Sequence, residues 1–428
     1  MSVNRIRSLA PSELVFATPG AFSPAGLCVR VRGELDIAAL SIAFAALRRR
    51  YPVLAAALEQ DESGYVIVAR QDPLPGVIVT EGDLEAAMPD ICADQTRVLS
   101  GLYVTHDGNR AAIALFTHHS IADGHHAVTV LADLWSLYTD VVSGKPVDDT
   151  EWGYPESMEK VLADRGIHKA DSDLLGGSTP QPTNKESAVE EPAAAVSEPL
   201  RVRNTPRVYS TPTARCRLDV GTTAALLAFA RRNETTFNGV LSAVIMRVEA
   251  ELNGVSPERI KYSYMVNLRS RIEPAVANPA VTNPLGIASF VAGGDLDDTV
   301  AVATAITGQL RDDLNDKLIH QAGLRYAESK SAMIEQLGQM PADERPIPVI
   351  STNLGVVPHL RSPAQLEFED FRCLMPEVQV ATDAQYVPRI YILSTFQDRL
   401  AIELASAADP AADQKRITAI ESTLLTLI

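Results

Sequence analysis

The chain has 428 residues, of which 46% are hydrophobic and 21% are charged, as in an ordinary globular protein that can bury a large core without disulfides or metals. Its 54 acidic and 38 basic side chains give a formal net charge of −16. So acidic a surface argues against sequence-independent nucleic-acid binding, which needs clustered basic side chains, and against docking to an anionic membrane.

Neither targeting segments nor paired cysteines are visible in the sequence. No apolar run approaches the roughly 20 residues of a transmembrane helix, and the N-terminus lacks the apolar core of a secretory signal. The four cysteines lie at positions 28, 92, 216 and 373, and no pair has the spacing of a zinc or redox site. We therefore expect a cytoplasmic protein with free thiols and no transmembrane segment.

Residues 1–170 mix strand and helix patterns. Leu27, Val29 and Val31 alternate with polar neighbours, as in a half-buried strand, and Asp36 can cap the helix that follows. The elements expected after this strand are a helix over 36–50, short strands over 51–58 and 64–69, a strand over 110–117 and a helix over 125–142.

The composition changes sharply in the segment 171–212, which is rich in proline and poor in large apolar side chains. Such a segment cannot bury enough apolar area to offset its ordering entropy. We interpret it as a flexible linker between an N-terminal half, 1–170, and a C-terminal half, 213–428. The other interpretation is a long surface loop within one domain.

Residues 213–428 repeat the mixture of strands and helices. Asn253-Gly254 can end a long apolar helix over 236–252. The other expected elements are helices over 222–232 and 411–428 and strands over 214–218, 261–268, 286–293, 346–352, 389–396 and 400–406. Both halves thus predict α/β layers.

The segment most informative about chemistry is Thr117–Gly124, which reads THHSIADG between an apolar strand and an apolar helix. A histidine at such a junction is held by a rigid strand and can face a cleft. Because an imidazole has an ordinary pKa near 6.5, it can accept a proton at neutral pH. Gly124 permits a backbone conformation or a close approach that a side chain would block.

This segment resembles HHxxxDG, the signature of the superfamily of chloramphenicol acetyltransferases, peptide-synthetase condensation domains and plant BAHD acyltransferases. Within it, the chain most resembles the polyketide-associated acyltransferases, the phthiocerol/phthiodiolone dimycocerosyl transferases. Other segments that carry the resemblance are RRYPVLAAAL, Met265–Arg269, Asn283–Gly286 and Ser351–Gly355. The DFGWG motif of plant enzymes is absent.

The resemblance implies an α/β fold of two chloramphenicol-acetyltransferase-like subdomains with a channel at their interface. It implies that His119 is the catalytic base and that Asp123 points away from the substrate to pair with an arginine, most plausibly Arg269. Arg271 is the alternative partner, or both arginines face solvent. We expect His118 to be a packed neighbour. The oxyanion donor stays open among Ser351, Thr352 and Asn353.

The reaction implied by the resemblance is transfer of a fatty or polyketide-derived acyl group from a thioester to a hydroxyl, without an acyl-enzyme, metal or other cofactor. The donor is an acyl carrier domain of a polyketide synthase or acyl-CoA, and the acceptor is a hydrophobic alcohol or diol. An acidic carrier needs a local basic patch, for which Arg231, Arg232 and Arg311 are candidates.

Three other interpretations are weighed against this one. Four histidines, 118, 119, 125 and 126, suggest zinc, but they lack ligand spacing. His118 and Asp123 also fit the HxxxxD pattern of glycerolipid acyltransferases, whose membrane-associated segments are missing. A non-catalytic or peptide-bond-forming condensation-type module that docks carriers is the main alternative, and thioester consumption would test the non-catalytic form.

Overall fold

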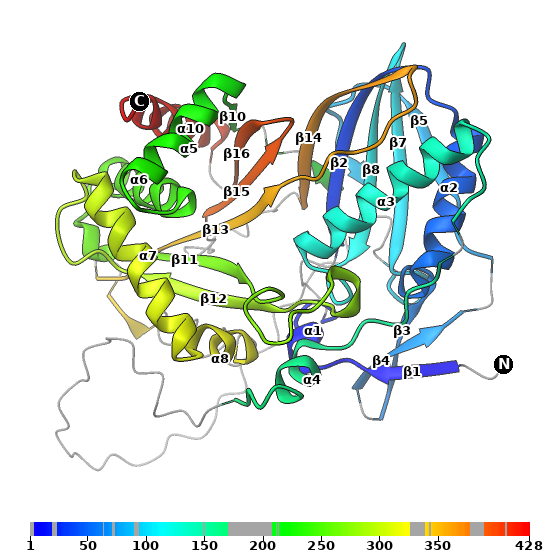
Figure 1. Ribbon diagram of the computed structural model, residues 1–428, viewed down its shortest axis with the longest axis horizontal. Coiled ribbons are helices and arrows are strands. Elements are labelled where there is room, and N and C mark those ends of the chain that lie inside the picture. The colour runs from blue at the N-terminus through cyan, green and yellow to red at the C-terminus, as the bar shows by residue number, and fades with distance from the viewer. Residues whose placement is uncertain are drawn as a thin grey trace.

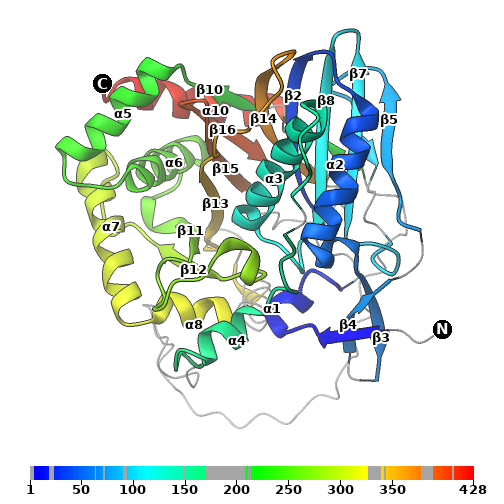
Figure 2. The same ribbon diagram turned by 45° about the vertical axis from the view of Figure 1, so that its right-hand side comes forward.

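The computed structural model shows two lobes side by side (Figures 1 and 2). The structure describes residues 4–18, 24–62, 64–70, 73–89, 94–148, 150–169, 208–210, 212, 214–325, 339–341, 344–376, 389–406 and 409–428. Residues 171–207 and 211 of the predicted linker lie outside this described part, so its flexibility and the two domain boundaries stay predictions.

The first lobe is built on a seven-stranded sheet with two helices on one face (Figure 2). In spatial order its strands are β5 (Val77–Glu81), β7 (Ser100–Asp107), β8 (Arg110–His118), β2 (Pro24–Gly33), β14 (Leu366–Pro376), β9 (Val208–Ser210) and β6 (Met88–Pro89). The helices are α2 (Ile37–Arg50) and α3 (Gly124–Val142). As predicted, Asp36 caps α2 by accepting a hydrogen bond from the Ala39 amide.

Strand β8 leads the chain to the histidine motif. From Ala111 to His118 all its residues are buried, because side chains on one face pack under α2 and α3 and those on the other face join a second apolar cluster around Phe116 and Tyr209. A strand buried on both faces reads as a continuous apolar run rather than an alternating one. The motif is thus anchored at its start by one of the most buried strands of the lobe.

A small three-stranded sheet and one short helix border the first lobe, and a second short helix packs on the core of the second lobe (Figure 1). These elements are β1 (Asn4–Ser8), β4 (Gly64–Ala69), β3 (Ala57–Asp61), α1 (Pro11–Leu14) and α4 (Met158–Ala163). The strand predicted over 51–58 is wrong in its first part. Residues Pro52–Ala55 form a 3₁₀ turn with proline at its start, and β3 begins only at Ala57.

The second lobe packs its helices against a six-stranded sheet. In spatial order the strands are β10 (Arg215–Arg217), β16 (Arg399–Ala405), β15 (Arg389–Phe396), β13 (Ile347–Val356), β11 (Ile260–Asn267) and β12 (Leu285–Phe290). The helices are α5 (Val220–Arg232), α6 (Phe237–Asn253), α7 (Thr299–Asn315), α8 (Leu318–Leu324) and α10 (Pro410–Leu425). Helix α6 ends at Gly254 in the left-handed conformation, as expected.

One strand from the C-terminal part of the sequence lies in the first lobe. Strand β14 pairs antiparallel with β2, from Leu366 opposite Gly33 to Leu374 opposite Gly26 (Figure 1). Asp370 on this strand forms an ion pair with Arg215 of β10, with 2.7 Å between Nη1 and Oδ2. The first lobe is therefore completed by a late segment of the chain, and a buried ion pair from this segment reaches the second lobe.

Candidate active site

The histidine motif forms the turn between β8 and α3. Asp123 is the N-cap of α3, and its Oδ1 accepts a hydrogen bond from the His126 amide at 2.9 Å. Such a cap satisfies an amide group that the first helical turn leaves free. The turn is thus fixed at its first residue by β8 and at its last by the cap.

Arg269 at the end of β11 supplies the partner of Asp123. Its Nη1 lies 2.7 Å from Asp123 Oδ2, and the two side chains are 3% and 0% exposed. Burial alone would raise the pKa of the Asp123 carboxyl, but the Arg269 charge and the hydrogen bonds outweigh it and hold this pKa below its ordinary value. Arg271 is exposed and is not the partner.

Close packing explains the glycine of the motif. A Cβ at Gly124 would lie 2.4 Å from Cδ2 of Leu354 on β13, so the start of α3 and the end of β13 approach each other too closely for a side chain. Of the two expected reasons for a glycine here, a special backbone conformation or a close approach, the structure shows the close approach. It also brings the histidine turn next to the Ser351–Gly355 segment.

His118 is enclosed by polar partners. It is fully buried, with Nδ1 2.7 Å from Ser120 Oγ and Nε2 3.1 Å from Gln95 Oε1. Burial, with a smaller contribution from neighbouring His119, lowers its pKa to about 3. Both ring nitrogens are engaged in the fold, which leaves neither for a substrate.

His119 is placed differently. Its ring is half-buried and stacks on the ring of Phe16, with centroids 4.1 Å apart and planes 5° apart. Nδ1 is buried and has no hydrogen-bond partner among the described residues. Burial lowers the pKa of His119, although its own carbonyl oxygen, Asp123 and Asn283 each oppose the shift. The imidazole is therefore neutral, and basic, at neutral pH.

Asn283 fixes the backbone of His119 from the second lobe. Its Nδ2 donates to the His119 carbonyl oxygen at 2.7 Å, and its Oδ1 is buried without a partner among the described residues. The sequence suggested only a turn before Pro284 at this position. A buried amide beside a histidine can orient the ring and favour one tautomer.

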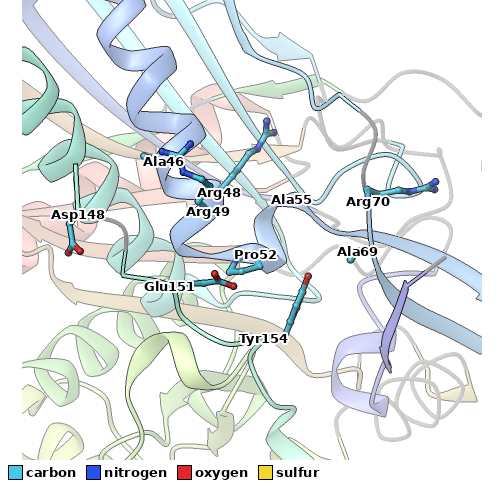
Figure 3. A pocket seen from close by; sticks show the side chains of 10 residues that line it. All are labelled: Ala46, Arg48, Arg49, Pro52, Ala55, Ala69, Arg70, Asp148, Glu151 and Tyr154. Atoms are coloured by element: carbon cyan, nitrogen blue, oxygen red, sulfur yellow. The ribbon is translucent and has the colours of Figure 1, made fainter. Parts of the chain in front are cut away.

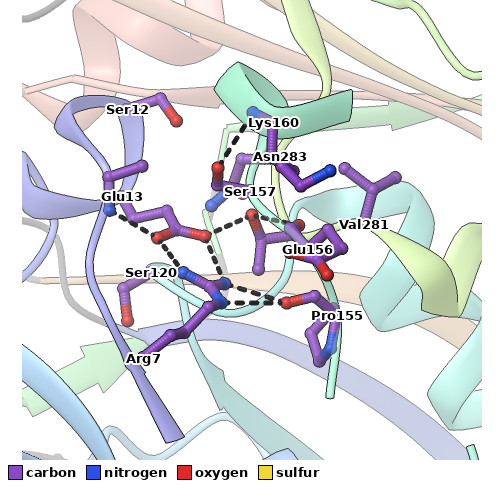
Figure 4. A network of polar contacts seen from close by, with 12 residues as sticks. Arg7, Ser12, Glu13, Ser120, Pro155, Glu156, Ser157, Lys160, Val281 and Asn283 are labelled. Atoms are coloured by element: carbon purple, nitrogen blue, oxygen red, sulfur yellow. Dashed lines mark hydrogen bonds and ion pairs between the residues drawn. The ribbon is translucent and has the colours of Figure 1, made fainter. Parts of the chain in front are cut away.

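A buried glutamate, which the sequence analysis missed, supports the same region (Figure 4). Glu13 is fully buried and accepts a hydrogen bond at 2.7 Å from each terminal nitrogen of Arg7. It also accepts from the Thr282 hydroxyl at 2.7 Å, and the Thr282 carbonyl in turn accepts from the Asp123 amide at 3.2 Å. This network connects the N-terminal segment, the second lobe and the histidine turn.

The three oxyanion candidates on β13 differ in their surroundings. Ser351 is buried on the α6 side, where its Oγ accepts from the Tyr262 hydroxyl at 2.7 Å. Asn353 donates to Asn238 Oδ1 at 3.1 Å and accepts from the Gly355 amide at 2.8 Å. Thr352 is half-buried, lies on the same strand face as Leu354 by alternation, and makes no side-chain hydrogen bond to a described residue.

The candidate docking arginines lie on the outer helices of the second lobe. Arg231 and Arg232 are exposed in the last turn of α5, and Arg311 is exposed on α7. The turn that follows α5 contacts α7 where Thr235 Oγ1 lies 3.2 Å from Thr307 Oγ1, one turn before Arg311. Asp312 follows Arg311 directly, so the patch is not purely basic.

A separate pocket of ≈ 360 Å³ lies beside the C-terminal end of α2 (Figure 3). Its lining includes Arg48, Arg49, Arg70 and Tyr154 but none of the predicted site residues. The Arg48 guanidinium is already held by the carbonyl oxygens of Pro75 and Ser100 at 2.6 and 2.8 Å. We assign this pocket no part in the chemistry.

Comparison with known proteins shows the family of the chain. A family model described as phthiocerol/phthiodiolone dimycocerosyl transferase C-terminus matches residues 208–405. The transferase of this name from Mycobacterium ulcerans (strain Agy99) is 35% identical over 403 residues, covering 93% of this chain and 91% of the relative. The chain belongs to the phthiocerol/phthiodiolone dimycocerosyl transferase family. It is an acyltransferase, as the motif predicted.

The solved structures support the same family and fold. Polyketide synthase associated protein 5 from Mycobacterium tuberculosis superposes with a TM-score of 0.75 at 30% identity, over 99% of this chain and 97% of that one. A condensation domain of the calcium-dependent antibiotic synthetase superposes with a TM-score of 0.59 at 16% identity, covering 99% and 96% of the two chains, a likeness of fold alone. The predicted two-lobed α/β fold is confirmed.

Two absences concern the described residues only. None of the helices they form is both long and apolar enough to cross a bilayer. Nor do they contain a group of three or more His, Cys, Asp or Glu side chains placed to hold a metal ion.

Proposed function

We propose that the protein transfers a fatty or polyketide-derived acyl group from a thioester to the hydroxyl of a lipid alcohol or diol, with His119 as the general base. The observation that carries the proposal is the contrast between two adjacent histidines. His118 has both ring nitrogens engaged, whereas His119 is half-buried, has one ring nitrogen enclosed without a partner among the described residues, and has a pKa that burial lowers.

In the proposed reaction one proton moves from the acceptor hydroxyl to His119 and then to the departing thiolate. Nε2 of His119 removes the hydroxyl proton as the oxygen forms a bond to the thioester carbonyl carbon. When the tetrahedral intermediate collapses, the carbon–sulfur bond breaks and the thiolate takes the proton from the imidazolium. No electrons enter or leave, so the step calls for no redox cofactor, and the acyl group need not be carried on the enzyme.

Asp123 has a structural part in this proposal. Its two carboxylate oxygens are engaged by His126 and Arg269, so neither is available to a substrate. The negative charge still raises the pKa of His119, which favours the imidazolium formed during attack. Our choice for the oxyanion donor is Thr352, whose hydroxyl has no hydrogen-bond partner among the described residues and which lies on the same strand face as Leu354, the neighbour of Gly124.

The thioester donor is a carrier-protein domain of a polyketide synthase or acyl-CoA. The relative of known structure is described as polyketide synthase associated, which favours a carrier domain, and the relatives' names favour a lipid diol as acceptor. Arg231, Arg232 and Arg311 are the proposed docking positions for an acidic carrier. We retain the expectation that the protein is cytoplasmic, because both thioester donors are made in the cytoplasm.

The purified full chain should be offered one acyl group as acyl-CoA and as acyl carrier protein, with alcohols and diols of graded length, and esters detected by mass spectrometry. His119→Ala should abolish most ester formation. His359→Ala removes an exposed histidine and serves as the matched control. An amide product from an amine acceptor, with no ester, would favour the condensation-type alternative.

A further inference from the structure

Phe16 lies against the one histidine of the motif that is left for a substrate. It follows α1 in a turn in which its amide donates to the Glu13 carbonyl oxygen at 3.1 Å. Its ring and that of His119 are almost parallel, with planes 5° apart and centroids 4.1 Å apart. Both side chains are half-buried, so the stack lies at the edge of the core.

The backbone around Phe16 is fixed on both sides of it. Before it, the Glu13 side chain is held by Arg7 and by the Thr282 hydroxyl of the second lobe. After it, the Ala17 carbonyl oxygen accepts a hydrogen bond from Gln95 Nε2 at 3.0 Å. Gln95 also contacts His118 through its Oε1. The Phe16 ring is thus presented to His119 from an anchored segment (Figure 4 shows the Glu13 anchor).

We propose that Phe16 is a positioning residue for His119: its ring face fixes the imidazole plane and stabilises the imidazolium formed when Nε2 takes the acceptor proton. This inference rests on the proposed role of His119 as the base. The face of an aromatic ring carries negative charge density, and it attracts a cation whose centre lies within about 6 Å of the ring centroid. A neutral imidazole is attracted to the ring face less strongly than an imidazolium. The stack therefore favours the imidazolium, which forms only during the reaction.

Few other charges face His119. Asp123 at the start of α3 raises its pKa, while His118 at the end of β8 is neutral near pH 7 because its own pKa is about 3. Glu13, on the segment that carries Phe16, is paired with Arg7. The carboxylate of Asp123 is shared with Arg269, and two uncharged groups, Asn283 and the His119 carbonyl oxygen, also raise the pKa of His119. The Phe16 ring adds its stacked face to these groups.

The test replaces Phe16 with leucine, which keeps apolar volume but removes the π face, and with tyrosine, which keeps it. The pKa of His119 is read in the full chain by NMR of ¹³C-labelled histidine, with the resonance assigned from His119→Gln, and independently from the pH profile of kcat/KM. Leu14→Ala, at an exposed position of the same segment, is the control.

Phe16→Leu should lower the pKa of His119 by about 0.5–1.5 units and kcat by about three- to thirtyfold, with a smaller change in KM. Phe16→Tyr should restore both values, and Leu14→Ala should leave both unchanged. An unchanged or raised pKa in folded Phe16→Leu overturns the inference. Because NMR reads the pKa without turnover, this result is separate from a failure of His119 as the base, which an active His119→Ala protein would reveal.

Discussion

Asp123 and Arg269 join the two lobes through a single carboxylate. One oxygen caps α3 at the His126 amide, and the other lies 2.7 Å from Arg269 Nη1, with both side chains almost inaccessible to solvent. The helix that follows the histidine turn is therefore oriented by a residue 146 positions away in the sequence.

Removing either partner of this pair should destabilise the protein. Asp123→Ala and Arg269→Ala should each lower the free energy of unfolding by roughly 3–5 kcal/mol, because the remaining charge is left buried and unpaired. The double variant should lose less than the sum. Denaturant unfolding of the three variants gives the coupling energy, and strict additivity would contradict direct pairing.

His119→Ala should lower kcat by about 10²–10⁴-fold while thermal stability changes little, because it removes general-base assistance. His118→Gln should act mainly on stability, since the His118 ring is enclosed by Ser120 and Gln95. Steady-state kinetics beside thermal unfolding separates the two effects. Near-wild-type turnover by folded His119→Ala protein would remove the basis of the mechanism.

The pH profile should reflect the lowered pKa of His119. The neutral imidazole is the active form, so kcat/KM should be level at neutral pH and fall tenfold per unit as the pH drops below this pKa. Because burial places the pKa below 6.5, the fall should begin on the acid side of that value. A midpoint above pH 7 in the His119-dependent activity would contradict the burial of the ring.

Thr352→Val should lower kcat by about 10²–10³-fold with little change in KM, if its hydroxyl stabilises the oxyanion. Ser351→Ala is the comparison, because the Ser351 hydroxyl is already bound to Tyr262 inside the second lobe. That variant should lose stability rather than turnover. Equal kinetic effects of both substitutions would argue against Thr352 as the donor.

Gly124→Ala should destabilise the protein by about 1–3 kcal/mol, because the added methyl group overlaps the Leu354 side chain. Leu354→Ala should be less damaging in the Gly124→Ala background than in the wild type, since it removes the clash. Gly308→Ala on α7, where nothing lies near the added Cβ, should be neutral or slightly stabilising. Thermal unfolding of these four variants measures the overlap directly.

Local sequence patterns predicted individual helices and strands better than they predicted which strands pair with one another. The cap at Asp36, the end of α6 at Gly254 and the strand–turn–helix around His119 depend on neighbours in sequence, and all three are present. Strand β14 was missed because a bulge between Phe368 and Asp370 breaks its alternation.

The site residues within a sequence motif could be predicted, whereas those that come from distant segments of the chain could not. Arg269 was reached through the family resemblance, because a carboxylate and an arginine far apart in sequence show no spacing signal. Phe16 and Glu13 could not be found in this way. Their contacts arise where the N-terminal segment packs on the histidine turn, for Phe16, and on Thr282 of the second lobe, for Glu13, and neither residue stands in a recognisable pattern.

Strand β14 has a consequence for the protein during its synthesis. β2 is made early, but its neighbour on one side is residues 366–374, which the ribosome adds more than 300 residues later. Until then the nascent chain presents an unpaired edge of β2, whose buried residues include Val29 and Val31. Such an edge is a template for wrong pairing. The first lobe can close only after the second has largely emerged, so the two lobes mature together and not one after the other.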